Sequence, residues 1–221
     1  MDNLENHTHD HKIKIPIKEC SETLIEFDEK EFILEPMYFK WGHTSDPTMK
    51  ARESVIKKLR EARKNLPKGY NFKIWDGFRT LKVQKILYDD YYERLKKEHT
   101  DFSHEKLCQM VEIFVSPPSH DPEFPAPHNT GGAIDLTIVD ENRNELEMGT
   151  PFDEFTERAF TNHFAKKQDS KNHKNRMIFK EIMESVGFAN YFEEWWHYSY
   201  GDQEWAKTRD KTNALYGSME L

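Results

Sequence analysis

The sequence is poor in cysteine and has no long hydrophobic run. Cys20 and Cys108 are its two cysteines, and they form neither a C-x-x-C pair nor the spacing of a zinc finger. We expect two separate thiols, although the sequence leaves a single disulfide open. No apolar stretch could cross a bilayer, and the N-terminus lacks the apolar core of a signal peptide. We therefore expect a cytoplasmic protein without a membrane partner, unless a leader has been removed.

An excess of positive charge is also missing. The 221 residues include 32 Lys and Arg against 40 Asp and Glu, for a net charge of −8. This balance argues against nucleic acid as a partner, since binding it needs a basic surface. Only 36% of residues are hydrophobic, but 13% are aromatic, and disordered chains are usually poor in aromatics. The composition favours one folded domain with a heavily charged surface.

The N-terminal segment differs from the rest of the chain. Residues 1–20 are polar and carry His7, His9 and His11 in alternation. Alternating imidazoles could bind a metal adventitiously, but we expect a mobile tail here. The sequence thus predicts a domain over residues 21–221.

Hydrophobic periodicity predicts a compact α+β domain. The spacing of apolar residues predicts helices over 48–66, 80–98, 103–115 and 174–186, the last ending at Gly187. Period-two and apolar runs predict strands over 71–75, 133–139 and 195–200. The proline-rich residues 116–127 must form a loop, and residues 140–172 favour surface loops with short helical pieces. This order predicts a central antiparallel sheet flanked by helices.

His128 and Asp135 lie where a polar side chain is unfavourable unless it has a partner. His128 ends the proline-rich loop, and Gly131 and Gly132 then allow a tight turn or a close backbone approach. Asp135 lies inside the apolar strand that follows, where a carboxylate needs a partner, a hydrogen bond or a metal ion. The alternative is an aspartate that caps a neighbouring loop.

A second unusual stretch is the aromatic run around Glu194 and His197. Strand alternation would place Trp195, His197 and Ser199 on one face, so that Glu194 would point away from His197. The two side chains converge only if Glu194 precedes the strand or a bulge re-aims it. The alternative is a buried, hydrogen-bonded histidine in an aromatic core.

Together these residues predict a metal-dependent hydrolase. Two histidines and one carboxylate are ligands that catalytic zinc uses, with a fourth position left for water. Glu194 could act as the base, and Arg79, in Asp76-Gly-Phe-Arg79 after a strand, could stabilise an oxyanion. A local Asp76–Arg79 salt bridge is the alternative for that stretch. The sequence contains no G-x-S-x-G, P-loop or G-x-G-x-x-G motif.

At these residues the sequence resembles the D-alanyl-D-alanine dipeptidases of the VanX type, within the zinc D,D-peptidases. That group has S-x-H-x-x-G-x-A-x-D, matched at 126–135 apart from its serine, and E-x-x-H, matched at 194–197. The dipeptidase branch adds D-G-[YF]-R, matched at 76–79, and E-W-W-H-[FY]-S-Y-G-D-Q, matched at 194–203. The resemblance runs over roughly residues 36–206 in order and spacing.

The resemblance implies a small D,D-dipeptide as substrate and one zinc ion per chain in a constricted cleft. It implies that the zinc ligands are His128, Asp135 and His197. It also implies Glu194 as the base and Arg79 as the transition-state stabiliser, and Asp76 could orient Arg79.

One position departs from the family pattern. Ala126 replaces the serine whose hydroxyl helps to hold the substrate in the family, which puts the dipeptide preference in question. A zinc D,D-carboxypeptidase or endopeptidase acting on peptidoglycan peptides is the nearest alternative. A non-catalytic zinc-binding domain of the same fold is another. The sequence leaves open the oligomeric state and the purpose, whether antibiotic resistance, scavenging or cell-wall turnover.

Overall fold

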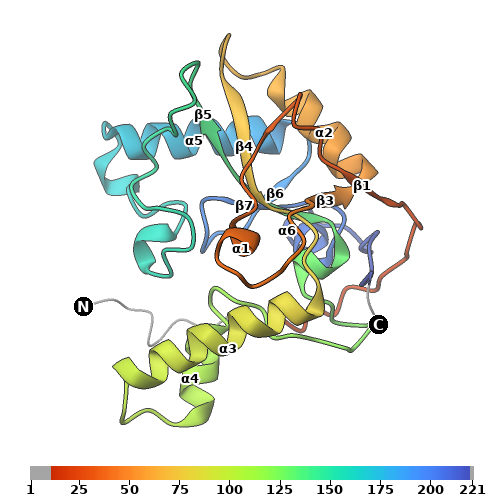
Figure 1. Cartoon of the computed structure of the whole chain (residues 1–221), viewed down its shortest axis with the longest axis vertical. Coiled ribbons are helices and arrows are strands. Elements are labelled where there is room, and N and C mark those ends of the chain that lie inside the picture. The colour runs from red at the N-terminus through yellow and green to blue at the C-terminus, as the bar shows by residue number, and fades with distance from the viewer. Residues whose placement is uncertain (1–10, 220–221) are drawn as a thin grey trace.

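The computed structural model describes residues 11–219, and a five-stranded sheet forms their centre (Figure 1). The strands lie in the order β2-β4-β5-β7-β6, with bounds Ile33–Leu34, Asn71–Asp76, Ala133–Val139, His197–Ser199 and Ala189–Asn190. β4, β5, β7 and β6 pair antiparallel, as predicted, whereas the edge strand β2 runs parallel to β4. A separate two-stranded sheet joins β1 (Leu24–Glu26) to β3 (Lys50–Arg52).

Helices flank this sheet, which confirms the predicted α+β class. Their bounds are Met37–Lys40 (α1), Glu53–Arg63 (α2), Leu81–Glu98 (α3), His104–Val111 (α4), Lys171–Ser185 (α5) and Gln203–Thr208 (α6). α2 packs against α5, and α3 and α4 form a second pair at the other end of the molecule (Figure 1). Thr80, Ser103 and Ser170 precede α3, α4 and α5, and each side chain accepts a hydrogen bond from a backbone N–H of the first turn.

β5 is buried on both faces, which explains its almost continuous apolar sequence. Ile134 pairs with Tyr198 of β7, and the Tyr198 ring lies 4.9 Å from the ring of Phe179 in α5. α5 therefore covers the face to which Ile134 and Tyr198 belong. Because side chains alternate along a strand, Asp135 lies on the opposite face.

The helix predicted over 48–66 is wrong at its beginning. Residues from Lys50 to Arg52 form β3, and the helix begins at Glu53. The cause is a tertiary contact, because the buried Arg52 side chain donates from Nε to Thr130 O at 2.7 Å. Local periodicity does not encode a contact over that sequence distance, and tertiary context overrides propensity.

The other predicted elements hold with shifted ends. The helix predicted over 103–115 ends at Val111, and the strand predicted over 195–200 begins at His197 because the two preceding tryptophans lie in a turn. The loop over 116–127 is confirmed, and residues 140–172 contain two short 3₁₀ helices, η3 (Glu157–Ala159) and η4 (Ala165–Lys167). The prediction missed β1, β2, α1, β6 and α6, none of them longer than six residues.

The N-terminal segment is described from His11 onwards. His7 and His9 lie outside the described residues, so a mobile tail there stays a prediction. Ile13 is buried, and Ile17 forms a parallel bridge with Ala214. The part of the segment that the structure describes therefore packs on the domain.

Two sequence expectations concern features elsewhere in the chain. Cys20 and Cys108 are free cysteines. None of the helices within residues 11–219 combines the length and the apolar character needed to cross a membrane.

Candidate active site

The register of the sheet places three of the predicted site residues in one row. Asp135 of β5 stands opposite His197 of β7 on one side and opposite Asp76 of β4 on the other. Directly opposed residues in paired strands share a face, so Asp135 and His197 must meet. The register of β4 shifts between Ile74 and Asp76, at a bulge or similar irregularity. Such a shift re-aims the side chain that follows, and Asp76 can join the same row.

His128 reaches this row from a short 3₁₀ helix, η2 (Pro127–Thr130). The helix ends at Gly131, which has a φ of 73° in the left-handed region. A Cβ at Gly131 would lie 2.4 Å from Leu24 Cδ2. The positive φ is the stronger reason for glycine here, since the end of the Leu24 side chain could shift, so the Gly131 of the sequence motif sets the turn between His128 and β5.

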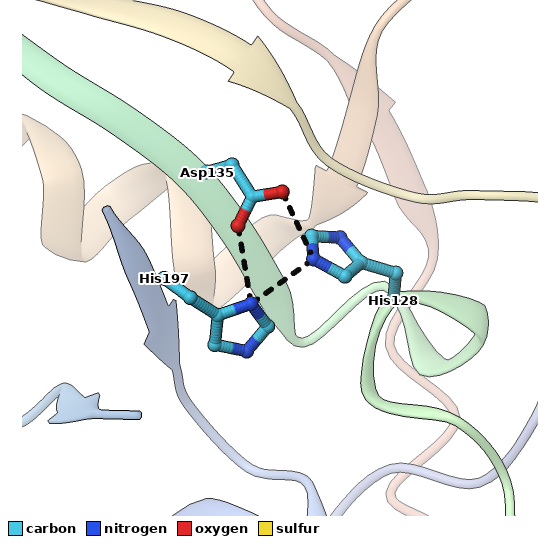
Figure 2. Close-up of side chains that lie close together, drawn as sticks. All are labelled: His128, Asp135 and His197. Carbon is cyan, nitrogen blue, oxygen red and sulfur yellow. Dashed lines mark hydrogen bonds and ion pairs between the residues drawn. The ribbon is translucent and has the colours of Figure 1, made fainter. Parts of the chain in front are cut away.

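The His128, Asp135 and His197 side chains point toward one another (Figure 2). His197 Nδ1 lies 3.1 Å from Asp135 Oδ1 and 3.2 Å from His128 Nε2, and His128 Nε2 lies 3.3 Å from Asp135 Oδ2. One ligand atom from each residue lies within 4.8 Å of the others, and all three residues are buried. This group is therefore close enough to hold a metal ion.

Hydrogen bonds outside the group orient both imidazoles. His128 Nδ1 donates to Gly77 O at 2.8 Å, which leaves the lone pair of Nε2 facing the group. His197 Nε2 lies 3.3 Å from Ser199 Oγ, so Nδ1 faces the group. Such outer hydrogen bonds fix the tautomer and ring orientation of metal-binding histidines.

The charges of the group also fit a cation. Burial alone would raise the pKa of Asp135, but the His128 and His197 imidazoles hold it well below its usual range. Burial alone would lower the pKa of His128, but the Asp135 carboxylate raises it. The pocket thus favours an anionic Asp135 with a positive charge beside it, and the donor set of two imidazoles and one carboxylate is one that zinc takes.

Arg79 is fixed at the edge of the group by several hydrogen bonds. Its Nε donates to Asp76 Oδ2 at 2.9 Å, its Nη2 to Tyr38 Oη at 2.9 Å, and its Nη1 to Gln84 Oε1 at 3.1 Å. Nη2 also lies 3.5 Å from Asp135 Oδ2. The Asp76–Arg79 salt bridge that the sequence suggested exists, and it holds the guanidinium against the group as a fixed cation.

Glu194 lies in a turn immediately before β7 rather than in the strand. Glu194 N donates to Tyr191 O, and His197 N donates to Glu194 O. This turn removes the alternation that would have sent Glu194 away from His197, and Glu194 Oε2 lies 3.7 Å from His197 Nδ1. Burial, together with the Asp135 and Asp153 carboxylates, raises the pKa of Glu194 well above its usual value.

A cavity of about 550 Å³ joins these residues. Its lining includes every predicted site residue except Asp76. It also includes residues that the sequence did not assign to this site, notably His11, Tyr38, Gln84, Ser116 and Asp153. Tyr38 Oη donates to Asp153 Oδ2 at 3.1 Å, and burial with the Asp135 carboxylate raises the pKa of Asp153 to about 7. Asp153 belongs to the region predicted as surface loop, where no pattern set it apart.

Ala126 does not line this cavity. It is buried and lines a neighbouring pocket of about 510 Å³ instead. Among the described residues that line the 550 Å³ cavity, Ser116 is the only serine or threonine. The hydroxyl that the family pattern led us to expect at position 126 is therefore absent, and a different hydroxyl faces the cavity.

Comparison with known sequences finds relatives that are D-alanyl-D-alanine dipeptidases. The sequence is 27% identical to a D-alanyl-D-alanine dipeptidase of Synechocystis sp. over 237 residues, covering 94% of this chain and 96% of the relative. It is 31% identical to a D-alanyl-D-alanine dipeptidase of Enterococcus faecalis over 158 residues, covering 71% of this chain and 75% of that protein.

A solved structure and a family profile complete the comparison. The vancomycin-resistance D,D-pentapeptidase VanY in complex with Zn(II) aligns with a TM-score of 0.45 and 16% identity, covering 76% of this chain and 82% of that chain. That likeness is too distant to carry an argument about the site. The profile of the D-ala-D-ala dipeptidase family matches residues 48–214, which include every predicted site residue. The chain belongs to the D-ala-D-ala dipeptidase family.

Proposed function

We propose that this protein is a zinc-dependent dipeptidase that hydrolyses D-alanyl-D-alanine or a closely related D,D-dipeptide. The observation that carries the proposal is the convergence of His128, Asp135 and His197 beside the buried Glu194. Family membership supports the substrate, since both relatives described above are D-alanyl-D-alanine dipeptidases.

We assign one zinc ion per chain to His128 Nε2, the Asp135 carboxylate and His197 Nδ1. When bound, zinc acts as a Lewis acid that polarises a carbonyl and lowers the pKa of a coordinated water to about 7. Three protein ligands leave a position open, as catalytic zinc sites require. The chain supplies the remaining parts of the chemistry.

Glu194 is the group we assign as general base. Its carboxylate accepts a proton from the attacking water and delivers it to the departing amino group. Burial and the neighbouring carboxylates raise the pKa of Glu194, and a cation held by the neighbouring triad would lower it, which would favour the carboxylate form that accepts a proton.

Arg79 and Asp76 are assigned to the transition state. The guanidinium faces the cavity with three of its hydrogen-bonding directions already fixed by Asp76, Tyr38 and Gln84. A preorganised cation needs little reorganisation when negative charge develops on the carbonyl oxygen. Asp76 holds the guanidinium in place and does not line the cavity itself.

Asp153 supplies a partner for the free amino group of the substrate. A carboxylate that lines the cavity can pair with an ammonium, and Tyr38 Oη fixes its orientation. A free dipeptide carries that ammonium one residue from the scissile bond, whereas a long wall peptide does not. The cavity chemistry therefore favours dipeptides over longer peptides.

Metal analysis coupled to an assay of D-alanine release tests this proposal. We expect one zinc per chain and release of D-alanine from D-Ala-D-Ala that a chelator abolishes and zinc restores. A muramyl pentapeptide cleaved in preference to the dipeptide would point to a carboxypeptidase. Zinc-loaded protein that cleaves no D,D- or L,D-peptide would contradict an enzymatic role.

A further inference from the structure

Residues 11–17, which we call the N-terminal strap, show a period-two pattern. Ile13, Ile15 and Ile17 are buried or half-buried, whereas residues 12, 14 and 16 are exposed. Alternation of this kind is typical of an extended segment with one face on the protein. His11 has the same parity as the isoleucines and is likewise partly buried, so its side chain faces the domain.

The strap is anchored along its length. The Gln203 side chain of α6 donates from Nε2 to Ile13 O at 2.9 Å and to Ile15 O at 2.7 Å. Ile17 pairs with Ala214, and Ile15 and Ile17 pack on a small apolar cluster that includes Trp205. These contacts hold the strap on the domain and thereby fix the position of His11.

His11 lies in a partition between two cavities. The catalytic cavity of about 550 Å³ and its neighbour of about 510 Å³ share four lining residues, namely His11, Ser116, Pro127 and Glu204. His11 Nε2 lies 2.5 Å from Glu112 O, and Ser116 Oγ lies 3.1 Å from His11 Nδ1. Hydrogen bonds on both ring nitrogens hold the imidazole in the partition.

Different nitrogens of the Arg79 guanidinium connect it to Asp153 and to the partition. From Arg79 Nη2, hydrogen bonds lead through Tyr38 to Asp153. From Arg79 Nη1, they lead through Gln84, whose Nε2 donates to Ser116 O at 2.7 Å. We therefore orient the dipeptide in this cavity with its ammonium at Asp153, its scissile carbonyl near Arg79 and its carboxyl end toward His11.

We propose that His11 is a specificity-determining residue that closes the carboxyl end of the substrate cavity and limits the substrate to two residues. This inference rests on the proposed function and adds to it the group that sets substrate length. Removal of the imidazole joins the two cavities, and the neighbouring cavity then accepts a third residue.

The test compares D-Ala-D-Ala with the tripeptide D-Ala-D-Ala-D-Ala on zinc-loaded protein. We expect His11→Ala to raise the ratio of kcat/KM for the tripeptide to that for the dipeptide by about tenfold or more, the discrimination that one misfitting group produces in a closed pocket. His11→Gln, which keeps comparable length and hydrogen-bonding groups, should restore a ratio close to that of the unaltered protein. Acetyl-D-Ala-D-Ala extends toward Asp153 instead and should gain nothing from His11→Ala.

Lys14→Ala is the matched control, because Lys14 lies on the same strap and is exposed. It should leave the ratio unchanged, and thermal melting should show that all three variants remain folded. The inference is overturned if the unaltered protein cleaves D-Ala-D-Ala but His11→Ala leaves the ratio unchanged, or if acetyl-D-Ala-D-Ala gains equally. If the unaltered protein cleaves neither peptide, the proposed function fails and this inference fails with it.

Discussion

The two sides of the catalytic cavity are built from different parts of the chain. Asp135 and His197 stand on neighbouring strands in fixed register, and two glycines after the short η2 helix connect His128 to the same strands. Other lining residues come from less regular segments, with His11 on the N-terminal strap, Ser116 in the proline-rich loop and Asp153 in a loop. We call the first set the strand side of the cavity and the second set the loop side. Groups that must be placed within tenths of an ångström are best carried by regular elements, whereas loops can vary to change specificity.

The largest effect is expected from the strand side. His197→Ala removes one of three proposed ligands, so the protein should lose both bound zinc and D-Ala-D-Ala hydrolysis. Metal analysis after dialysis measures the first and D-alanine release the second. His163→Ala, at an exposed histidine, is the control and should retain both. Full zinc content in His197→Ala would show that the ion binds elsewhere.

Glu194→Gln should separate chemistry from metal binding. We expect kcat to fall by roughly 10²–10⁴-fold, the usual contribution of a general base, while zinc content is unchanged. Glu193→Gln is the matched control, because the adjacent Glu193 is equally buried but lines a different pocket. Activity that survives Glu194→Gln with zinc bound would remove Glu194 from its assigned role.

Asp153→Asn tests the loop side and should act on substrate binding. Loss of a charge-assisted hydrogen bond to the substrate ammonium should raise KM by about 10–100-fold, equivalent to about 1.5–3 kcal/mol, with a smaller change in kcat. Burial and the Asp135 carboxylate raise the pKa of Asp153 to about 7, which also predicts a pH effect. The carboxylate is lost as the pH falls through its pKa, which bound zinc would lower, so KM should rise below neutral pH.

The pH effect has its own control. In Asp153→Asn no carboxyl group remains at this position, so the acid-side rise in KM should disappear. A KM that rises equally in both proteins would assign the effect to another group.

Ser199→Ala should have the smallest effect. Ser199 Oγ contacts His197 Nε2 and no proposed catalytic atom, so its removal loosens a ligand without removing it. Changes in such outer contacts cost about tenfold or more in metal affinity. Competition with a chelator measures the zinc dissociation constant, and kcat at saturating zinc should change little. An unchanged dissociation constant would mean that Ser199 does not position His197.

The sequence indicated the strand side of the cavity because each of its residues is costly where it stands. Asp135 in an apolar strand, His197 among aromatic residues and the paired glycines 131 and 132 all depart from the residue preferences of their surroundings. The structure brings Asp135 and His197 into contact. The orientation of Glu194 could not be predicted from strand alternation, because it depends on a turn at residues 195–196. The two tryptophans in that turn have strong strand propensity, so the sequence did not indicate it.

The loop side was missed for the opposite reason. Asp153 lies in a charged region where another aspartate is unremarkable, and only the fold encloses it. A signal for the strap was present, because Ile13, Ile15 and Ile17 alternate with polar residues or proline. That period-two pattern could have predicted an extended, packed segment and an inward-facing His11, instead of a mobile tail throughout residues 1–20.

The most direct test of the zinc site is anomalous diffraction at the zinc absorption edge from crystals of the zinc-loaded protein. The account predicts one strong peak per chain, about 2.0–2.2 Å from His128 Nε2, His197 Nδ1 and an Asp135 carboxylate oxygen. A peak at any other position, or none beside these three atoms, would contradict it.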